Sequence, residues 1–468
     1  MALVSIALLL LTSIPLTYIQ AEAVQNNPKY ATYQERMHAL NNVISLAPSP
    51  EPAADSISKS RAATSSDNTD GSKNIIDVRS NGAVGDENTD DSKAFKASWD
   101  LACNKTYQAK ILVPKGYSFL LQPIGFFGPC QNNLIFQVDG TIVAQPDPKS
   151  WSSNHDSWLE FNRVNGLTLQ GGGSIDGKGE KWWSCESCAR PVALRFRTCK
   201  NLTVRGSDES RLSIKNSPQF HVVIDQECHN VTVDSISIVS PATSPNTDGI
   251  HIASKDIVIR NSHISNGDDC ISMSNESENI HIENMDCRDG HGISIGSLGK
   301  DNSKEIVKNI TVTNCSISKS QNGVRIKTWA RGSGLVSNVK YENIQMNEVL
   351  NPIIIDQFYC PDNSCNKTDT NSKLLISDVT YTNITGTYDT EKAAVYLNCS
   401  SKVPCVNITI VDMRLLSDTK GEEQPGSICA NASGCLGEEI QPPVTCLRKG
   451  SSQFFDNISK KGVKCTNK

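Results

Sequence analysis

The sequence has 468 residues, of which 38% are hydrophobic and 20% are charged, and 45 Lys and Arg against 50 Asp and Glu give a net charge of −5. A chain of this length can bury a large core, and its many Ile- and Val-rich stretches exclude a wholly disordered protein. Proteins that bind nucleic acid phosphates are normally basic, so the small negative charge argues against nucleic acid as a partner.

Residues 1–23 have the pattern of a secretory signal peptide. An apolar run over residues 1–16 is followed by a small-x-small cleavage site at residues 21–23. The run is too short for a transmembrane helix, and no later stretch reaches the roughly 20 apolar residues that a span needs. Twelve Asn-x-Ser/Thr sequons and 17 cysteines point the same way. We therefore expect a secreted, extracellular protein without membrane contact after signal removal, and with at least one thiol unpaired within the chain.

Residues 24–74 are expected to form a disordered leader or pro-segment, because their Pro-, Ser- and Asp-rich composition offers little to bury. The folded domain is expected over residues 75–468, with a first strand at residues 75–78. Residues 91–103 then predict a helix that closes the amino-terminal end of the domain, with Asp91 or Ser92 as its N-cap.

From Asn165 onward one short phrase repeats: a polar residue, often Asn, followed by alternating apolar residues. It occurs at residues 165–169, 201–204, 230–233, 256–259, 279–282, 309–312, 338–341, 378–381 and 407–410. The five steps from Asn201 to Asn338 are 29, 26, 23, 30 and 29 residues. Each phrase has the period of a β-strand, and the residues between phrases lack the pattern of a crossover helix.

This constant period decides between the all-β architectures. A β-sandwich has turns roughly every 8 to 12 residues without such a long period, and a propeller blade needs roughly 40 residues. A period in the twenties, with several strands in each unit, is typical of a parallel β-helix. We therefore predict an all-β solenoid, a right-handed parallel β-helix of about ten coils with a short N-terminal capping helix.

Polar residues align when the coils are stacked. Five apolar residues occupy the same inward position of successive coils: Ile250, Ile271, Ile293, Val324 and Ile353. Two positions earlier the residues are Asp248, Asp269, His291, Asn322 and Asn351. Because neighbouring strands lie about 4.8 Å apart, the first three should form a ladder with Asp268 beside it. Arg325 and Lys327 alternate with inward residues and should both point outward.

This set of residue types favours catalysis. Three clustered carboxylates repel one another and raise at least one pKa, as a general acid requires. A nearby Arg and Lys suit an anionic substrate. The alternatives are a calcium site or a ladder of turn residues, and Asn246 or Asn322 alone would more often be structural. Without a family, the pattern predicts a carbohydrate hydrolase.

The segments that carry these residues resemble the four signature blocks of polygalacturonases, the pectin-cleaving glycoside hydrolases. The blocks are Asn246-Thr-Asp-Gly249, Gly267-Asp-Asp-Cys270, Gly290-His-Gly292 and Arg325-Ile-Lys327. The likeness covers about residues 75–446. The longer strings around the blocks, such as Gly290-His-Gly-Ile-Ser-Ile-Gly-Ser297, are similar to plant members. Four blocks in order are far more specific than any one of them.

The resemblance implies a role for each matched residue. Asp268 would be the general acid, Asp248 and Asp269 would activate water, and His291 would hold the protonation state of the acid. Arg325 and Lys327 would bind a galacturonate carboxylate. Two residues complete the expected set of substrate-binding positions: Tyr359 and Asn246. No cofactor and no metal are expected.

The expected reaction is inverting hydrolysis of α-1,4 bonds between galacturonic acid units of pectin, by a monomer in the cell wall. A calcium-dependent pectate lyase and a non-catalytic pectin-binding solenoid remain as alternatives.

The spacing of the cysteines also suggests three disulfides, although the sequence leaves the pairing open: Cys270–Cys287, Cys360–Cys365 and Cys399–Cys405.

Overall fold

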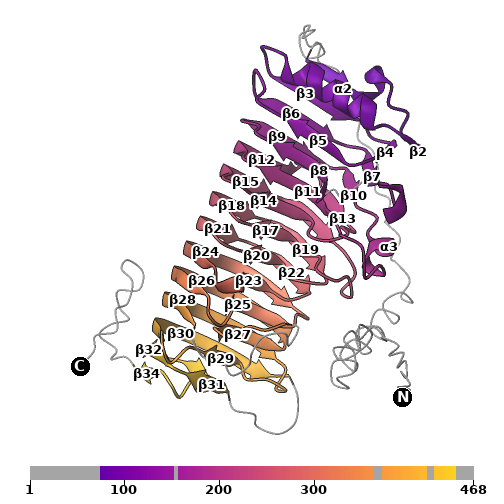
Figure 1. Cartoon of the computed structure of the whole chain (residues 1–468). Coiled ribbons are helices and arrows are strands. Elements are labelled where there is room, and N and C mark those ends of the chain that lie inside the picture. Colours follow the sequence, from indigo (N-terminus) through magenta and orange to yellow (C-terminus); the bar gives the residue numbers. More distant parts are fainter. Residues whose placement is uncertain (1–73, 152–155, 362–371, 419–425, 450–468) are drawn as a thin grey trace, which may run out of the picture. The chain divides into compact units, whose positions relative to one another are not determined.

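The domain is a right-handed parallel β-helix, as predicted, in which the chain winds through two sheets of parallel strands (Figure 1). The computed structural model describes residues 74–151, 156–361, 372–418 and 426–449. The expected signal peptide and all but the last residue of the expected leader lie outside these residues. No helix in the described ranges is both long and apolar enough to cross a membrane.

One sheet contains a single strand from each of eleven successive coils, which agrees with the expected coil number. We call it the eleven-stranded sheet. Its strands are β5 (Ile124–Phe127), β8 (Ser157–Asn162), β11 (Val192–Arg197), β14 (Val222–Asp225), β17 (Ile250–Ile252), β20 (Ile271–Met273), β23 (Ile293–Leu298), β25 (Asn322–Thr328), β27 (Asn351–Asp356), β29 (Val395–Asn398) and β31 (Ser427–Ala430).

The other sheet has 23 strands and forms the remaining walls of the coils. Its first strands are β1 (Ile75–Asp77), β2 (Asp86–Asp90), β3 (Ala109–Val113), β4 (Ser118–Leu121), β6 (Leu134–Val138), β7 (Thr141–Ala144), β9 (Leu167–Gly171), β10 (Ser174–Asp176), β12 (Lys200–Gly206), β13 (Leu212–Lys215), β15 (His229–Asp234) and β16 (Ile236–Val239). It continues with β18 (Lys255–Arg260), β19 (His263–Asn266), β21 (Glu278–Glu283), β22 (Asp286–Asp289), β24 (Lys304–Ser318), β26 (Ser333–Val349), β28 (Lys373–Tyr388), β30 (Cys405–Ser417), β32 (Ala432–Leu436), β33 (Ile440–Gln441) and β34 (Arg448–Lys449).

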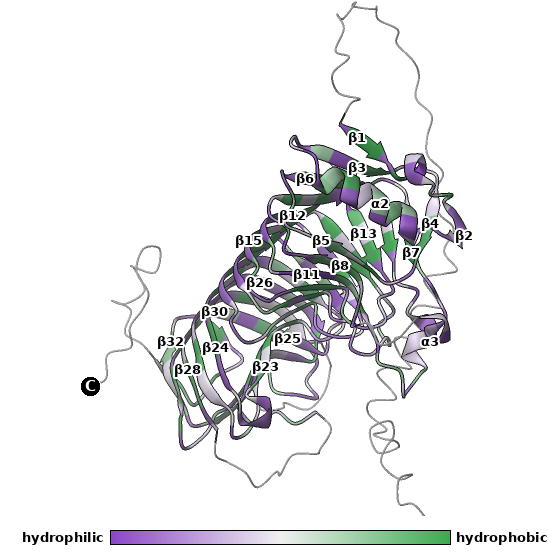
Figure 2. Cartoon of the chain, turned by 45° about the horizontal axis from the view of Figure 1, so that its top comes forward, coloured by the Kyte–Doolittle hydropathy of each residue, from purple (hydrophilic) through white to green (hydrophobic). Residues whose placement is uncertain are grey.

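The core runs along the axis of the helix because inward residues of successive coils stack on one another. Ile250 pairs with Ile271, Ile271 with Ile293, and Val324 with Ile353, so the predicted inward column is confirmed. All of these side chains are fully buried. Figure 2 shows the hydrophobic and hydrophilic residues that alternate along the strands, as expected where one side of each strand packs inside.

A ladder of asparagines explains why Asn begins so many of the repeated phrases. The Asn230 side-chain amide donates to Asn201 Oδ1 at 2.7 Å, and Asn309 and Asn338 continue the pattern one coil at a time. These residues have φ near +55°, the left-handed conformation that Asn tolerates better than most residues. The repeated Asn therefore serves both the turn and the contact between coils.

The predicted helix is α2 (Ser92–Cys103), which packs against the first coils at the amino-terminal end (Figure 1). Asp91 is its N-cap residue, but the carboxylate accepts hydrogen bonds from the backbone of Val84 and Gly85 instead of the helix. Trp99 is fully buried against Phe126 and Phe161, with ring centroids 5.2 and 5.6 Å away. The helix thus covers an aromatic core that would otherwise face water.

The other helical segments are short and lie between strands. They are α3 (Glu180–Trp183), η1 (Val78–Asn81), η2 (Pro148–Ser150) and η3 (Lys300–Asn302). The first expected strand is therefore one residue shorter than predicted, because Val78 already belongs to a 3₁₀ turn.

Two of the three suggested disulfides are present, Cys270–Cys287 and Cys399–Cys405. Cys360 is also disulfide-bonded, but Cys365 lies outside the described residues, so their pairing stays a prediction. Three further disulfides join Cys103 to Cys130, Cys185 to Cys188 and Cys429 to Cys446. Among the described cysteines, three buried thiols are free: Cys199, Cys228 and Cys315.

Candidate active site

The predicted aspartates and His291 meet at the eleven-stranded sheet, at the starts of three successive strands. Asp248 lies two residues before β17, Asp268 and Asp269 lie just before β20, and His291 lies just before β23. The register pairs Ile250, Ile271 and Ile293, and counting back two residues from each gives Asp248, Asp269 and His291. The predicted ladder is therefore consistent with the strand register.

Asp268 and His291 form the most accessible pair of this group. His291 Nδ1 lies 2.9 Å from Asp268 Oδ1. The His291 side chain is 27% exposed and the Asp268 side chain is 17% exposed. The His291 backbone N–H donates to the Asp268 carbonyl at 2.9 Å. Gly290, with φ +47°, makes this close approach possible, since a Cβ there would lie 2.2 Å from that carbonyl oxygen. The pair can exchange a proton with a ligand above the sheet.

Asp269 is more deeply buried than Asp268 and His291, with 1% of its surface exposed. Its Oδ1 accepts from Arg325 Nη2 at 2.7 Å and from the Ser294 hydroxyl at 2.8 Å, and its Oδ2 accepts from Lys327 Nζ at 2.8 Å. Burial alone would raise the pKa of Asp269, but the charges of Lys327 and Arg325 outweigh it and hold the pKa well below its ordinary value. Asp269 is therefore ionised throughout the range in which enzymes work.

Asp248 is buried as well, but no cation forms an ion pair with it among the described residues. Its Oδ2 accepts from the Ser272 hydroxyl at 2.6 Å. Burial and the nearby charges of Asp268 and Asp269 raise the pKa of Asp248 well above its ordinary value. The expected pKa rise within the carboxylate cluster thus falls on Asp248, while Asp269, one coil away, is shifted in the opposite direction.

Arg325 and Lys327 point outward from β25, as predicted, since they alternate with the inward Val324 and Ile326. They are nevertheless 8% and 7% exposed, because both reach across two coils to Asp269. Their charges are therefore partly balanced within the protein. Each guanidinium or ammonium group has more donors than these bonds use, so both can still bind an anion.

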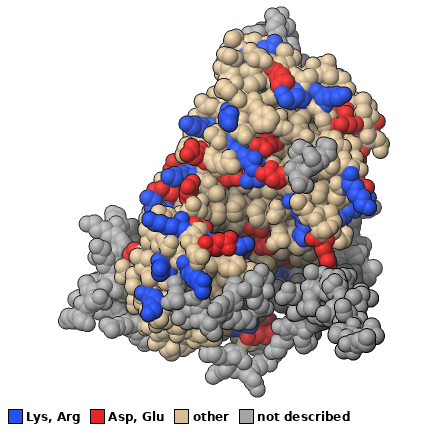
Figure 3. All heavy atoms as spheres, viewed as in Figure 1, with Lys and Arg blue, Asp and Glu red and all other residues tan. Residues whose placement is uncertain are grey.

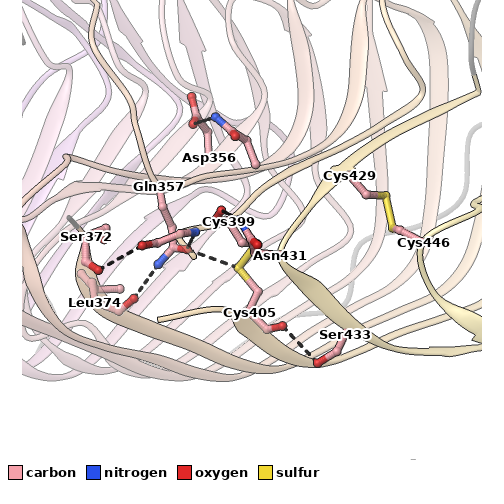
Figure 4. The surroundings of a disulfide bond; sticks show 12 residues. Asp356, Gln357, Ser372, Leu374, Cys399, Cys405, Cys429, Asn431, Ser433 and Cys446 are labelled. Atoms are coloured by element: carbon pink, nitrogen blue, oxygen red, sulfur yellow. Dashed lines mark hydrogen bonds between the residues drawn. A yellow bond between two sulfur atoms is a disulfide. The ribbon is translucent and has the colours of Figure 1, made fainter. Parts of the chain in front are cut away.

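Tyr359 lies beside these cations, in the segment that follows β27. Lys327 Nζ is 5.3 Å and Arg325 Cζ is 6.0 Å from the centroid of its ring. The segment is held by the fully buried Gln357, whose amide donates to the Leu374 carbonyl at 2.6 Å and accepts from the Ser400 backbone. Figure 4 shows this anchor next to the Cys399–Cys405 disulfide.

Asn246, the last predicted position, is exposed and has φ +55°. Its side chain has no hydrogen-bond partner among the described residues. Asn246 lies two residues before Asp248 in the chain, but no side-chain contact joins it to the aspartates in the described residues.

Four polar residues that the sequence analysis did not assign to the site also contact it. Asn266 is fully buried, and its amide donates to the backbone carbonyls of Thr247 and Asp269, which joins the two aspartate-bearing turns. Three outward residues of neighbouring strands, Ser272, Ser294 and His251, contact the carboxylates or each other. In the sequence, these three residues can be recognised only as outward positions of strands with alternating inward and outward residues. Every other outward residue has the same property, so the sequence does not assign these three to the site.

Two hollows lie on this sheet, on opposite sides of the aspartates in strand order. The first, of about 340 Å³, is lined by residues of β11, β14, β17 and the segments that precede β11 and β14, among them Arg195, Phe220 and His251. The second, of about 440 Å³, is lined by Arg325, Lys327 and their neighbours. Figure 3 shows acidic and basic side chains interspersed over one face of the molecule. A long polar ligand can thus lie across the aspartates.

One grouping has the composition of a metal site. An oxygen of Asp268, an oxygen of Asp269 and a ring nitrogen of His291 lie within 4.8 Å of one another. Both oxygens of Asp269 already accept from cations, however. A divalent ion there would have to displace or repel Arg325 and Lys327, so the donor set fits proton transfer better than metal binding.

Comparison with known proteins gives one consistent result. The model of glycosyl hydrolases family 28 matches residues 103–436. A probable polygalacturonase of Arabidopsis thaliana is 42% identical over 403 residues, 84% of this chain and 88% of that protein. A polygalacturonase of Prunus persica is 41% identical over 379 residues, 79% of this chain and 93% of that protein.

Solved structures show the same fold at lower identity. An endo-xylogalacturonan hydrolase from Aspergillus tubingensis superposes with a TM-score of 0.66 at 24% identity, over 81% of this chain and 100% of that one. An exopolygalacturonase from Thermotoga maritima gives a TM-score of 0.64 at 21% identity, over 81% and 92% of the two chains.

Proposed function

Since the chain belongs to glycosyl hydrolases family 28, we propose that it hydrolyses the α-1,4-glycosidic bonds between galacturonic acid units of pectin or polygalacturonate. The observation that carries this proposal is the constellation of three aspartates and His291 next to Arg325 and Lys327 on one sheet. It combines proton-transfer groups with cations that suit a polymer of uronic acids.

Asp268 is the proposed general acid. It is the partly exposed member of the cluster, and His291 Nδ1 lies 2.9 Å from its carboxylate. The acid protonates the glycosidic oxygen as the bond breaks, and His291 supports the return of the proton for the next turnover. General acid catalysis of this kind contributes roughly 10²–10⁴-fold to the rate.

Asp248 and Asp269 are proposed to activate the attacking water together. The shifts of their pKa values in opposite directions support a division of labour. Asp269 stays ionised and orients the water, whereas Asp248, once ionised, is the stronger base because of its raised pKa and accepts the proton of the water. Water then attacks opposite the leaving group, so the reaction inverts the anomeric centre.

The substrate is proposed to cross the aspartates with one carboxylate near Arg325, Lys327 and Tyr359. From β14 to β27 there are five strand steps, or about 24 Å at about 4.8 Å each, which suits several sugar units. Asn246 is assigned to a sugar at the rim of the site on the resemblance alone.

The two alternatives from the sequence fit less well. A calcium-dependent lyase would need a cation beside Asp269, where Arg325 and Lys327 already stand. A non-catalytic solenoid would not need carboxylates with opposite pKa shifts. The family to which the chain belongs consists of glycosyl hydrolases by its description, which agrees with an enzyme.

Secretion to the cell wall follows from the same proposal. Five disulfides within the described residues suit an oxidising compartment. We expect the enzyme to act there as a monomer on the wall polysaccharide. Fractionation of cells that express the tagged full chain tests the location, and light scattering of the purified protein tests the monomer.

Product analysis tests the reaction. We expect new reducing ends from polygalacturonate without an unsaturated product that absorbs in the ultraviolet, and no effect of a chelator. Proton NMR of fresh digests should show the β-anomer first. An α-anomer formed first would contradict inversion, and a chelator-sensitive unsaturated product would replace the hydrolase by a lyase. The size of the early products separates endo from exo cleavage.

A further inference from the structure

A chain of hydrogen bonds leads from the first hollow to Asp248. His251 on β17 lines the hollow, and its Nδ1 lies 2.8 Å from the hydroxyl of Ser272 on the next strand. The same hydroxyl donates to Asp248 Oδ2 at 2.6 Å. Ser272 is therefore the only described side chain that hydrogen-bonds to the Asp248 carboxylate.

The direction of these bonds follows from their chemistry. An ionised carboxylate accepts only, so the Ser272 proton lies toward Asp248 whenever Asp248 acts as a base. The Ser272 oxygen must then accept from His251 Nδ1–H. His251 Nε2, which lies 3.2 Å from the Ser274 hydroxyl, is left to accept. Burial lowers the pKa of His251 to about 4, so the imidazole is neutral above mildly acidic pH and keeps this one tautomer.

Packing holds the imidazole in place. The ring of Phe220 stacks on His251, with centroids 4.9 Å apart and planes 19° apart. The charged groups that act on His251 are Asp269, Arg195 and Lys327. Those that act on Asp248 are Asp268, Asp269 and Lys327. Ser272 is thus the link between a fixed neutral ring and a carboxylate surrounded mostly by other carboxylates.

A comparison with the next strand shows what the link does. Ser294 occupies the equivalent outward position, and its hydroxyl donates to Asp269 while it accepts from Arg325 Nε at 3.0 Å. Each serine thus bridges a carboxylate of the preceding coil and a side-chain nitrogen, which is His251 Nδ1 for Ser272 and Arg325 Nε for Ser294. The bridge to Asp269 ends on a cation, whereas the bridge to Asp248 ends on a neutral histidine. Asp248 therefore receives a donor without receiving a positive charge.

We propose that Ser272, oriented by His251, is a positioning residue that keeps Asp248 in its ionised, water-facing orientation during hydrolysis. This inference rests on the proposed role of Asp248 as part of the water-activating pair. The donor stabilises the charged form of a carboxylate that its surroundings push toward the neutral form. A cation in its place would make Asp248 as weak a base as Asp269.

The pH dependence of kcat/KM on polygalacturonate tests this proposal with four variants. Ser272→Ala should shift the acidic limb of the profile to higher pH by about one unit, because Asp248 then ionises only at a higher pH. The loss should therefore be about tenfold at the acidic end and small above the limb. It should affect kcat more than KM, since the substrate carboxylate is bound elsewhere.

The other variants separate positioning from structure. Ser272→Thr keeps the hydroxyl and should restore the wild-type limb. His251→Phe keeps the stacking on Phe220 but removes Nδ1–H, so it should move the limb in the same direction by less. Ser277→Ala is the matched control, because Ser277 is a buried serine of the same coil whose hydroxyl donates to the Ile252 carbonyl and makes no contact with Asp248.

The outcomes are distinct. A wild-type limb in Ser272→Ala, or equal losses at every pH in both the Ala and the Thr variant, would overturn the positioning role while hydrolysis by the wild type stands. A wild-type protein that releases no reducing ends would instead overturn the proposed function. If Ser272→Ala fails to fold, His251→Phe decides the question, and its unchanged limb would overturn the proposal.

Discussion

The two polar stacks of this solenoid, the asparagine ladder and the charged cluster on the eleven-stranded sheet, are built on the same coil register with opposite results. In the ladder, each amide donates to the amide one coil earlier, as Asn230 does to Asn201. In the cluster, neighbours differ in charge and length, so Asp248 and Asp269 end with pKa shifts of opposite sign. A uniform stack satisfies itself, whereas a mixed stack produces the perturbed groups that catalysis uses.

The largest expected effect lies in the cluster. Asp268→Asn should lower kcat by about 10²–10⁴-fold or more, because an amide cannot protonate the leaving oxygen. The melting temperature should change little, since Asp268 is partly exposed and hydrogen-bonds mainly to His291 and the Asp269 backbone. Reducing-end assays and thermal melts of the purified variant check both statements. A variant with wild-type rates would move the acid role to Asp269 or Asp248.

The next effect tests whether the cations serve the protein as well as the substrate. Lys327→Ala should weaken substrate binding and also destabilise the fold by roughly 1.5–3 kcal/mol, because it removes one charge-assisted hydrogen bond to Asp269 and leaves Arg325 as the remaining buried cationic partner. The exposed pair Lys340–Glu342 offers a control, since Lys340→Ala should cost under about 1 kcal/mol.

Denaturant unfolding measures the stability of both lysine variants, and KM on acidic and methyl-esterified pectin measures binding. The loss in binding should shrink with the esterified substrate, whose neutral groups need no cation. Equal losses on both substrates would mean that Lys327 acts only through Asp269.

A smaller effect concerns Asp248 and pH. Its folded pKa is raised, so between the unfolded and the folded pKa the native state binds more protons and stability falls as pH rises. Asp248→Asn removes this penalty. The variant should therefore gain stability relative to the wild type as pH increases from about 4 toward neutral. Thermal melts over that range provide the comparison, and a constant difference at all pH values would contradict the raised pKa.

The smallest effect is expected in the asparagine ladder. Asn279→Ala removes a bond to Asp256 Oδ1 at 2.8 Å and one from Asn309 at 2.9 Å, at a position with φ +56°. Stability should fall by about 1–3 kcal/mol, with no change in kcat or KM. Asn279→Gly, which tolerates this backbone, should recover part of the loss. An effect on kcat would mean that the two stacks are not independent.

The sequence predicts the fold well because equivalent positions of successive repeats pair with each other on adjacent strands. The alternation around Ile250, Ile271 and Ile293 specifies which side chains point inward, and the aspartates follow two positions earlier. The resemblance to polygalacturonases then supplies roles that the alternation cannot.

Contacts within the site were less predictable. Arg325 and Lys327 reach Asp269 two coils away, which depends on side-chain length and rotamer, not on register. Asn266 carries no feature in the sequence that assigns it to the site, yet it joins the two turns that carry the aspartates. Ser272 resembles any other outward serine in the sequence, because only the structure shows that its hydroxyl meets Asp248.

The register of the eleven-stranded sheet is preserved although the coils differ greatly in length. The stretch of chain from Ile250 to Ile271 is half as long as the stretch from Ile353 to Val395, and each pair still lies side by side on adjacent strands. The extra residues of the longer coils therefore leave the pairing of these strands unchanged, and with it the register that aligns the proposed catalytic groups. In this architecture, loops that border the substrate can be lengthened, shortened or exchanged while the reacting atoms keep their places, so substrate range and chemistry can evolve separately.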